Sequence, residues 1–209
     1  MTTIGDMEAL IVRARALADA GGRRLLGITG APGAGKSTVA ERVVDALGGA
    51  AVLVPMDGFH LANAELVRLG RRERKGAIDT FDAAGYVALL RRLRSPGASE
   101  TVYAPSFRRE IEEPIACAIP IGPDIPLVVT EGNYLLVTEG PWAEVRGLLD
   151  EAWFVAPDET LRVDWLIARH IAFGKPPEVA RAWSLSTDQR NADLVATTRA
   201  RADVVVRLP

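Results

Sequence analysis

The sequence predicts a three-layer α/β fold, in which a mainly parallel sheet of five strands is covered by helices on both faces. Short apolar runs alternate with helical patterns along the chain, an order typical of parallel sheets with helical crossovers. A glycine-rich loop joins the first expected strand, residues 25–29, to a helix over residues 36–47. Two later apolar runs finish at an acidic residue: residues 51–56 lead into residue 57, and residues 126–131 end at residue 131. Open parallel sheets bind their ligands at such strand ends.

The remaining segments continue the alternation of strand and helix. Prolines and charges interrupt the short β-type runs of residues 101–121, which predicts a small hairpin. We interpret residues 1–209 as one domain, with insertions at about 58–80 and 100–121 over a cleft. The other expected strands are residues 151–155 and 202–208, and the other expected helices are residues 6–20, 64–69, 83–94, 141–149, 158–174 and 178–196.

Composition favours an ordinary soluble protein. The chain has 209 residues, of which 48% are hydrophobic and 25% charged, and its net charge is -2. That balance gives no electrostatic reason to expect nucleic acid or an anionic membrane as partner. The N-terminus carries acidic residues, unlike a signal peptide, and no apolar run is long enough to span a membrane. The sole cysteine, Cys117, suits a reducing cytoplasm, and its apolar segment predicts a buried side chain.

Residues 30–38 read Gly-Ala-Pro-Gly-Ala-Gly-Lys-Ser-Thr, the spacing of the Walker A phosphate loop. Glycines at positions 33 and 35 allow backbone conformations that turn successive amide groups toward one anion. Lys36 can reach the outer phosphates of a nucleoside triphosphate, and the Ser37 hydroxyl can ligate Mg²⁺. The loop therefore predicts a P-loop NTPase fold that binds ATP and Mg²⁺. The expected nucleotide-binding residues of the loop are Gly30, Gly33, Ala34, Gly35, Lys36, Ser37 and Thr38.

Acidic residues end the two apolar runs that follow the loop. Asp57 can cap a turn with Gly58, or it can act as the base that phosphoryl transfer to a hydroxyl requires, and we favour the base. Glu131 ends a Walker B-like strand, where a carboxylate can hold Mg²⁺. His60 follows Asp57 closely and can bind a substrate or serve only the local structure.

Three groups of basic residues have open roles. Arg162 and Arg169 lie two turns apart on one expected helix, where either can neutralise phosphate charge. The segment 70–76, Gly-Arg-Arg-Glu-Arg-Lys-Gly, is either a solvated loop or a flap that contacts an anion. The segment 105–109, Pro-Ser-Phe-Arg-Arg, can present an arginine to the cleft or form salt bridges with nearby glutamates.

Several motifs together resemble the phosphoribulokinase/uridine kinase family. They are the phosphate loop at 30–38, Met-Asp-Gly-Phe-His at 56–60, Arg-Lys-Gly at 74–76, Thr-Phe-Asp at 80–82 and Thr-Glu-Gly-Asn-Tyr at 130–134. The segment before the last expected strand, residues 198–203, is similar to bacterial pantothenate kinases. Within the family, the chain looks like a nucleoside kinase-like branch often labelled fructose transport system kinases, a label that implies a sugar substrate.

The resemblance implies a role for each matching residue. Asp57 would be the general base, Glu131 would organise Mg²⁺, and Arg169 would be the lid arginine on the ATP phosphates, with Arg162 as the second candidate. Arg199 would lie near the adenine. The aromatic and acidic nucleoside pocket of uridine kinases is not recognisable, and the extra elements of pantothenate kinases are missing. The implied residues of the acceptor pocket are His60, Lys75, Phe81, Asp82, Tyr86 and Arg108.

The favoured hypothesis is a cytoplasmic, ATP-dependent kinase that phosphorylates a hydroxyl of a small, sugar-like metabolite. Pantothenate, nucleosides and sugar phosphates are the alternative acceptors; in the last case, arginines of segment 70–76 and Lys75 would grasp the second phosphate. A nucleotide-dependent regulatory ATPase is the alternative from another class. A homodimer is one assembly that the sequence leaves open.

Overall fold

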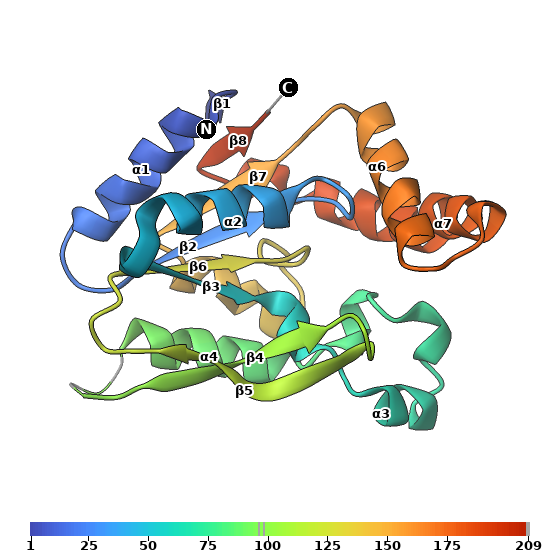
Figure 1. Cartoon of the computed structure of the whole chain (residues 1–209), viewed down its shortest axis with the longest axis horizontal. Helices are drawn as coiled ribbons and strands as arrows, with labels where there is room; N and C mark the ends of the chain where they lie inside the picture. Colours follow the sequence, from blue (N-terminus) through green and yellow to red (C-terminus); the bar gives the residue numbers. More distant parts are fainter. Residues whose placement is uncertain (96, 98, 208–209) are drawn as a thin grey trace.

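Six parallel strands form the middle layer of the computed structural model, in the part of the chain that it describes, residues 1–95, 97 and 99–207. Their order across the sheet is β1-β8-β7-β2-β6-β3 (Figure 1). The phosphate-loop strand β2 is therefore central, with β7 on one side and β6 on the other. The strands are β1 Thr2–Ile4, β2 Arg24–Thr29, β3 Ala51–Pro55, β6 Leu127–Glu131, β7 Glu151–Val155 and β8 Val204–Val206.

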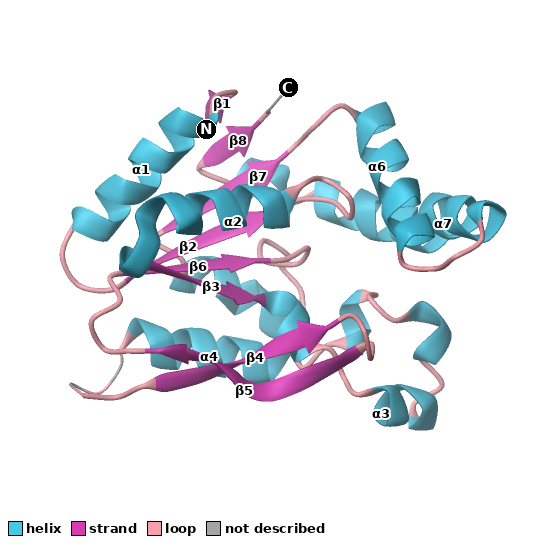
Figure 2. Ribbon diagram, viewed as in Figure 1, coloured by secondary structure: helices cyan, strands magenta, loops and turns pink. Residues whose placement is uncertain are grey.

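Helices cover both faces of the sheet, so the molecule has three layers (Figure 2). Helices α1 and α2 pack on one face, and α4 and α5 on the other. Helices α3, α6 and α7 lie beyond the carboxyl ends of the central strands (Figure 1). The helices are α1 Met7–Asp19, α2 Lys36–Leu47, α3 Asn63–Arg68, α4 Ala83–Arg94, α5 Val145–Leu148, α6 Glu159–Ala172 and α7 Pro177–Ala196.

Alternation along the central strands explains the two apolar cores. Leu26 and Val129 belong to the core under α1 and α2, whereas their neighbours Leu25 and Val128 belong to the core under α4 and α5. All four side chains are fully buried. Successive side chains of a strand point to opposite faces, so a strand covered on both faces must be apolar throughout.

The predicted fold class is confirmed, and α2, α4 and β7 have the predicted bounds. The sheet has one more strand than predicted, because β1 pairs with β8 at its edge. A three-residue strand is too short to carry a recognisable pattern. The helix expected at 141–149 is a 3₁₀ turn, Gly140–Glu144, followed by α5. The last strand ends at Val206, and residue 208 of the predicted strand lies outside the described residues.

The expected hairpin is present as the antiparallel pair β4, Val102–Arg108, and β5, Glu113–Ile121. Only one face of the hairpin is covered, through Val102, Ala104 and Ile121 in the core beside α4. The prediction that Cys117 is buried is wrong. Its side chain is exposed, because residues 115–118 lie in the part of β5 that no other element covers.

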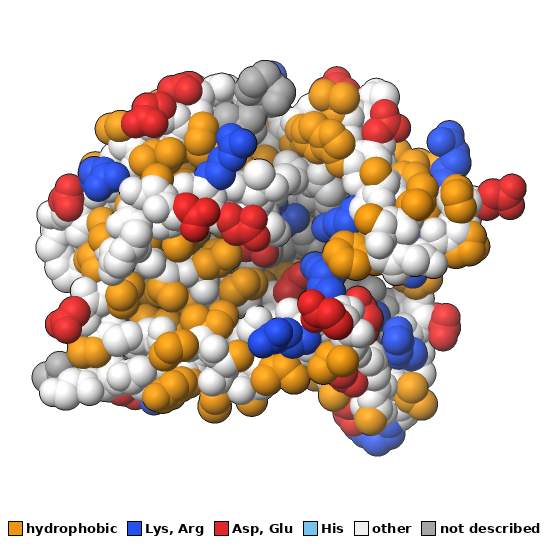
Figure 3. All heavy atoms as spheres, in the orientation of Figure 1, with side chains coloured by type: hydrophobic (Ala, Val, Ile, Leu, Met, Phe, Trp, Pro, Cys, Tyr) orange, Lys and Arg blue, Asp and Glu red, His pale blue; other side chains and the backbone are white. Residues whose placement is uncertain are grey.

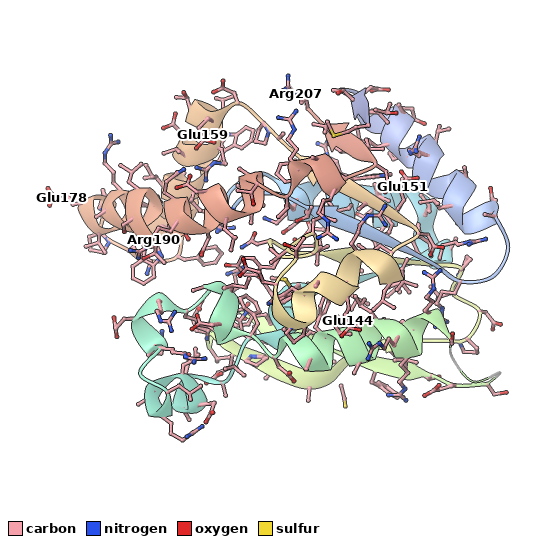
Figure 4. The ribbon with its side chains drawn as sticks, turned by 180° about the vertical axis from the view of Figure 1, so that it is seen from behind. Glu144, Glu151, Glu159, Glu178, Arg190 and Arg207 are labelled. Carbon is pink, nitrogen blue, oxygen red and sulfur yellow. The ribbon has the colours of Figure 1, made fainter. Side chains whose placement is uncertain are left out.

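Helices α6 and α7 form an arm beside the sheet. Figure 4 shows this arm from behind, with Glu159 at the start of α6 and Glu178 at the outer end of α7. Asp158 caps α6 by accepting hydrogen bonds from the amides of Thr160 and Leu161. Within the described residues, no helix has both the length and the apolar character needed to cross a bilayer.

Candidate active site

Strand register brings the phosphate loop and both acidic strand ends to one edge of the sheet. Glu131, the last residue of β6, is aligned with Ile28 of β2 on one side and with Pro55 of β3 on the other. The loop begins two residues after Ile28, and Asp57 lies two residues after Pro55. The parallel pairing therefore places Asp57 and Glu131 beside the loop.

Two glycines of the loop are required by close contacts. Gly30 has φ 154°, and a Cβ atom there would lie 2.6 Å from the carbonyl oxygen of Val155. Gly33 has φ 80°, and its Cβ would lie 2.8 Å from Cβ of Leu166 on helix α6. Neither position tolerates a side chain, so the loop is fixed against β7 and against the arm.

Arg162 supports the phosphate loop through a hydrogen bond to its backbone. Its guanidinium is 2% exposed and donates hydrogen bonds to the carbonyl oxygen of Pro32 and to Oε1 of Gln189, both at 2.8 Å. It also pairs with Glu159 at 2.5 Å. Its donors are thus held by protein groups. This environment favours a supporting role over that of a lid arginine, the second role that the resemblance implied.

Arg169 lies two turns further along helix α6 and occupies a different environment. It lines the cavity that also contains Lys36, Asp57 and Glu131. Burial among protein atoms lowers the pKa of its guanidinium, while nearby acids oppose that shift. Because α6 crosses over the loop, its first turns pack on the loop and its last turn reaches the cavity. The structure thus separates two arginines that the sequence could not tell apart.

Lys36 and Ser37 start helix α2 and face the acidic strand end. Lys36 is 8% exposed, and its ammonium donates to the carbonyl oxygen of Ala31 at 3.0 Å. The Ser37 hydroxyl donates to Oε1 of Glu131 at 3.2 Å. Serine hydroxyl and carboxylate are the hard oxygen ligands that Mg²⁺ prefers, so these two residues fit the metal that the loop predicts.

Burial shifts the pKa of both charged groups at this point. It lowers the pKa of the Lys36 ammonium to about 8, because desolvation disfavours the charged form. It raises the pKa of the Glu131 carboxyl, and the neighbouring charge of Asp57 adds to that shift. Each charge partly stabilises the other. The site therefore concentrates charge where water is scarce, as functional sites commonly do.

Asp57 forms an ion pair with Arg109, the residue that follows β4. The guanidinium Nη2 lies 3.0 Å from Oδ2 of Asp57. The same guanidinium stacks over the rings of Phe107, at 5.6 Å, and Phe173, at 5.9 Å. Arg109 thus connects the acidic strand end, the hairpin and the end of α6. Of the two expected alternatives for this segment, an arginine does reach the cleft, but it is Arg109 instead of Arg108.

His60 lies between two aromatic rings and close to Asp57. Its ring centroid is 4.0 Å from that of Phe81 and 4.8 Å from that of Phe107. Burial lowers the pKa of the imidazole, which favours the neutral form. Nδ1 lies 2.8 Å from the carbonyl oxygen of Asp57, which can only accept, so Nδ1 carries the proton. The other ring nitrogen, Nε2, is then an acceptor for a hydroxyl.

These residues surround a cavity of about 320 Å³, large enough for a small metabolite. In the space-filling view the molecule is hollowed beside the arm, and Lys, Arg, Asp and Glu side chains gather around the hollow (Figure 3). Of the expected site residues, those that line the cavity are Lys36, Ser37, Asp57, His60, Lys75, Phe81, Glu131 and Arg169.

Three expected acceptor residues do not line this cavity. Asp82 is exposed and caps α4 by accepting from the amide of Gly85 at 2.8 Å. Tyr86 is fully buried, and its hydroxyl bonds Oγ1 of Thr130 at 2.6 Å. Arg108 is exposed on the hairpin. A short motif predicts which residues are near a site, but helix and strand geometry decide which of them face it.

A second cavity, of about 480 Å³, lies on the other side of the loop. It is lined by the expected loop residues Ala34, Gly35 and Thr38, together with Trp165 of α6. The N-terminal segment 5–7, between β1 and α1, forms another wall. Arg199, which the resemblance implied near the adenine, lines neither cavity; it lies in a 3₁₀ turn after α7.

Several lining residues were not predicted from the sequence. Phe173, Lys175, Trp183, Asp188 and Asn191 come from the end of α6 and from α7. The charged and aromatic residues of this arm are spread over both helices without a recognisable motif. The residues that face the cavity depend on the angle between two helices, which periodicity does not give.

The fold and the site match a known protein family. Residues 25–207 match the phosphoribulokinase/uridine kinase family. The chain belongs to this family. Its members are kinases, and membership of a P-loop kinase family implies the use of ATP. The resemblance drawn from the sequence motifs is thereby confirmed.

Individual relatives differ in the substrates that their names give. The chain is 38% identical over 152 residues, 69% of its length and 88% of the relative's, to an ATP-dependent kinase-like protein, notR', of Aspergillus versicolor. It is 28% identical over 177 residues, 79% of its length, to a pantothenate kinase of Mycolicibacterium vanbaalenii, of which it covers 55%. A solved structure from Silicibacter sp. TM1040, provisionally assigned as a fructose transport system kinase, superposes with a TM-score of 0.84 at 33% identity, covering 96% of this chain and 98% of that one.

Burial of Glu131 predicts that the free energy of unfolding falls as the pH rises and the carboxyl ionises. Its pKa rises from 4.5 to about 7 on folding, so the folded protein holds this proton more tightly than the unfolded chain. The resulting stabilisation is complete below pH 4.5 and is lost as the pH rises through about 7. Glu131→Gln removes the titration, so above pH 7 it should raise the free energy of unfolding, by the order of 2 kcal/mol.

Urea unfolding of the ligand-free protein at pH 5 and pH 8 measures this effect. The gain of the variant over the wild type should be larger at pH 8 than at pH 5. Glu178→Gln, at the exposed outer end of α7, is the matched control and should show no such difference. If Glu131→Gln raises the free energy of unfolding equally at the two pH values, the buried Glu131 carboxyl does not have a raised pKa.

Proposed function

We propose that this protein transfers the γ-phosphate of ATP to a hydroxyl of a small, sugar-like metabolite. The observation that carries the proposal is the pair of acids, Asp57 and Glu131, on adjacent strand ends that share one cavity with Lys36 and Ser37. A phosphate loop alone requires one acid for the metal. A second acid facing the same cavity fits a base for an incoming hydroxyl.

Phosphoryl transfer would proceed by positioning and charge stabilisation. The acceptor oxygen attacks the γ-phosphorus, the bond from that phosphorus to the β–γ bridging oxygen breaks, and the hydroxyl proton passes to Asp57. Arg109 occupies Oδ2 of Asp57, which leaves Oδ1 for the hydroxyl. Lys36 and Arg169 neutralise charge on the phosphates. Ser37 and Glu131 would hold Mg²⁺, which supplies further charge neutralisation when bound.

The two cavities divide the substrates between them. The cavity with Asp57 is lined mostly by polar and charged groups and suits a hydroxylated acceptor. The second cavity contains Val39, Pro157 and Trp165, which suit a nucleobase. The phosphate loop and the start of α2 line both cavities, with Lys36 and Ser37 in the first and Ala34 and Gly35 in the second. We therefore assign the nucleoside of ATP to the second cavity and the acceptor to the first.

Sugar-like acceptors are favoured by the size and chemistry of the acceptor cavity. Its volume suits a metabolite of a few carbon atoms, and Asn133, Asn191 and His60 offer neutral hydrogen-bonding groups to hydroxyls. The name of the Silicibacter relative, which includes fructose, supports the same class.

Replacing Asp57 by asparagine should remove the base while keeping the shape of the site. The turnover number should fall by about 10²–10⁴, while the dissociation constant for ATP changes little, because Asp57 faces the acceptor and not the nucleoside. ADP release measured with and without a panel of polyols, nucleosides and pantothenate, together with calorimetric titration of ATP, tests this. Near-normal turnover of Asp57→Asn would exclude the assigned base.

Trp165→Ala tests the position of the nucleobase. Loss of an aromatic wall should raise the Michaelis constant for ATP about 10-fold and leave the constant for the acceptor unchanged. Leu185→Ala on α7 is the matched control, because Leu185 is similarly exposed and lines neither cavity. If the Michaelis constant for ATP is unchanged in Trp165→Ala, the nucleobase does not bind against Trp165.

A further inference from the structure

Basic residues of the segment 70–76 divide into two groups in the structure. Arg71 and Arg74 both pair with Asp79, at 3.4 and 2.5 Å, and neither lines the cavity. Arg72 and Lys75 line the acceptor cavity instead. Among residues 1–95, 97 and 99–207, no carboxylate lies within ion-pair distance of either one. The first pair thus supports the loop, and the second is available to a ligand.

Lys75 is held in place by neutral groups. Its Nζ donates to Oδ1 of Asn63 at 2.8 Å and to the carbonyl oxygen of Glu112, and it lies 4.9 Å from the ring centroid of Phe107. The side chain is partly buried, and desolvation lowers the pKa of its ammonium. The carboxylates of Glu112 and Glu113 favour the charged ammonium from beyond ion-pair distance, but neither hydrogen-bond partner of Nζ carries a charge, so an anionic ligand would supply a direct ionic partner.

A third cation reaches the cavity from the arm. Lys175 follows α6, lies 4.7 Å over the ring of Trp183, and has no ion pair within the described part of the chain. The acids on these walls do not cancel the three cations. The carboxylates on these walls are Glu112 and Asp188, which bonds His170 at 2.7 Å, so the acids are fewer than the three cations. Excess positive charge therefore surrounds the acceptor space, away from the phosphate loop.

We propose that the acceptor alcohol carries an anionic group, a carboxylate or a phosphate, that binds Lys75 and Arg72, with Lys175 on the opposite wall. The hydroxyl of the same molecule would face Asp57. This inference rests on the proposed kinase function and narrows its substrate class from sugar-like alcohols to their acids or phosphate esters. With a neutral sugar bound, Arg72, Lys75 and Lys175 would still have no ion-pair partner among the described residues.

Matched acceptors test the charge directly. Turnover is measured with glycerol, glycerate and glycerol 3-phosphate, and with glucose, gluconate and glucose 6-phosphate. The charged members should have Michaelis constants at least about 10-fold below those of their neutral counterparts. The carboxylate and phosphate arms distinguish the two anions. Equal or lower constants for the neutral members would overturn the inference while leaving the kinase function intact.

Variants of the basic residues test the location of the anion. Lys75→Gln and Arg72→Gln should each raise the Michaelis constant for the preferred charged acceptor about 10- to 100-fold, with little change in turnover number. Lys75→Arg should restore much of the loss, which a merely structural role would not do. Arg68→Gln is the control, because Arg68 pairs with Glu65 outside the cavity. If Lys75→Gln keeps the wild-type preference for charged over neutral acceptors, the anion does not bind at the assigned location.

Calorimetry separates this inference from the proposed function. If no alcohol gives turnover that depends on Asp57, the kinase proposal fails, and the same compounds are titrated into the ATP-bound protein. Binding that prefers glycerate or glycerol 3-phosphate over glycerol, and that Lys75→Gln weakens, supports the anion site independently. Absence of any such preference overturns it.

Discussion

The alignment of three parallel strands is the constraint on which the rest of the site depends. Backbone hydrogen bonds hold β6 between β2 and β3, so Glu131 is aligned with Ile28 and with Pro55. The three strands therefore end together, and the phosphate loop, Glu131 and Asp57 meet without any contribution from the surface insertions. The hairpin and the arm then close the space in front of this edge, and they supply the residues that face the acceptor.

Charge burial is the cost of this arrangement. Lys36 and Glu131 are each less than 10% exposed, and burial moves the pKa of each toward its neutral form. Neighbouring charges and the Ser37 hydroxyl offset part of the penalty. A nucleotide would add negative charge beside Lys36 and favour the charged ammonium. The free protein thus maintains an electrostatic environment that its substrates are expected to stabilise.

Sequence patterns predicted the central site better than its walls. The phosphate loop, Asp57 and Glu131 could be placed because strand, loop and helix follow one another locally and parallel strands end at one edge. The separation of Arg162 from Arg169 depends on how α6 crosses the loop, and the choice of Arg109 over Arg108 depends on hairpin geometry. Asp82 ends the Thr-Phe-Asp motif and Tyr86 lies about one helical turn later, yet helix capping and burial direct their side chains away from the cavity. Such long-range packing leaves no local signal in the sequence.

Phosphorus NMR of a reaction with ATP and the acceptor panel tests the central claim most directly, because it identifies what receives the γ-phosphate. Two acids on neighbouring strand ends predict a phosphate monoester of an alcohol, formed in equal amount with ADP. Production of ADP and inorganic phosphate alone, at a rate independent of every alcohol, would contradict the account and indicate an ATPase instead.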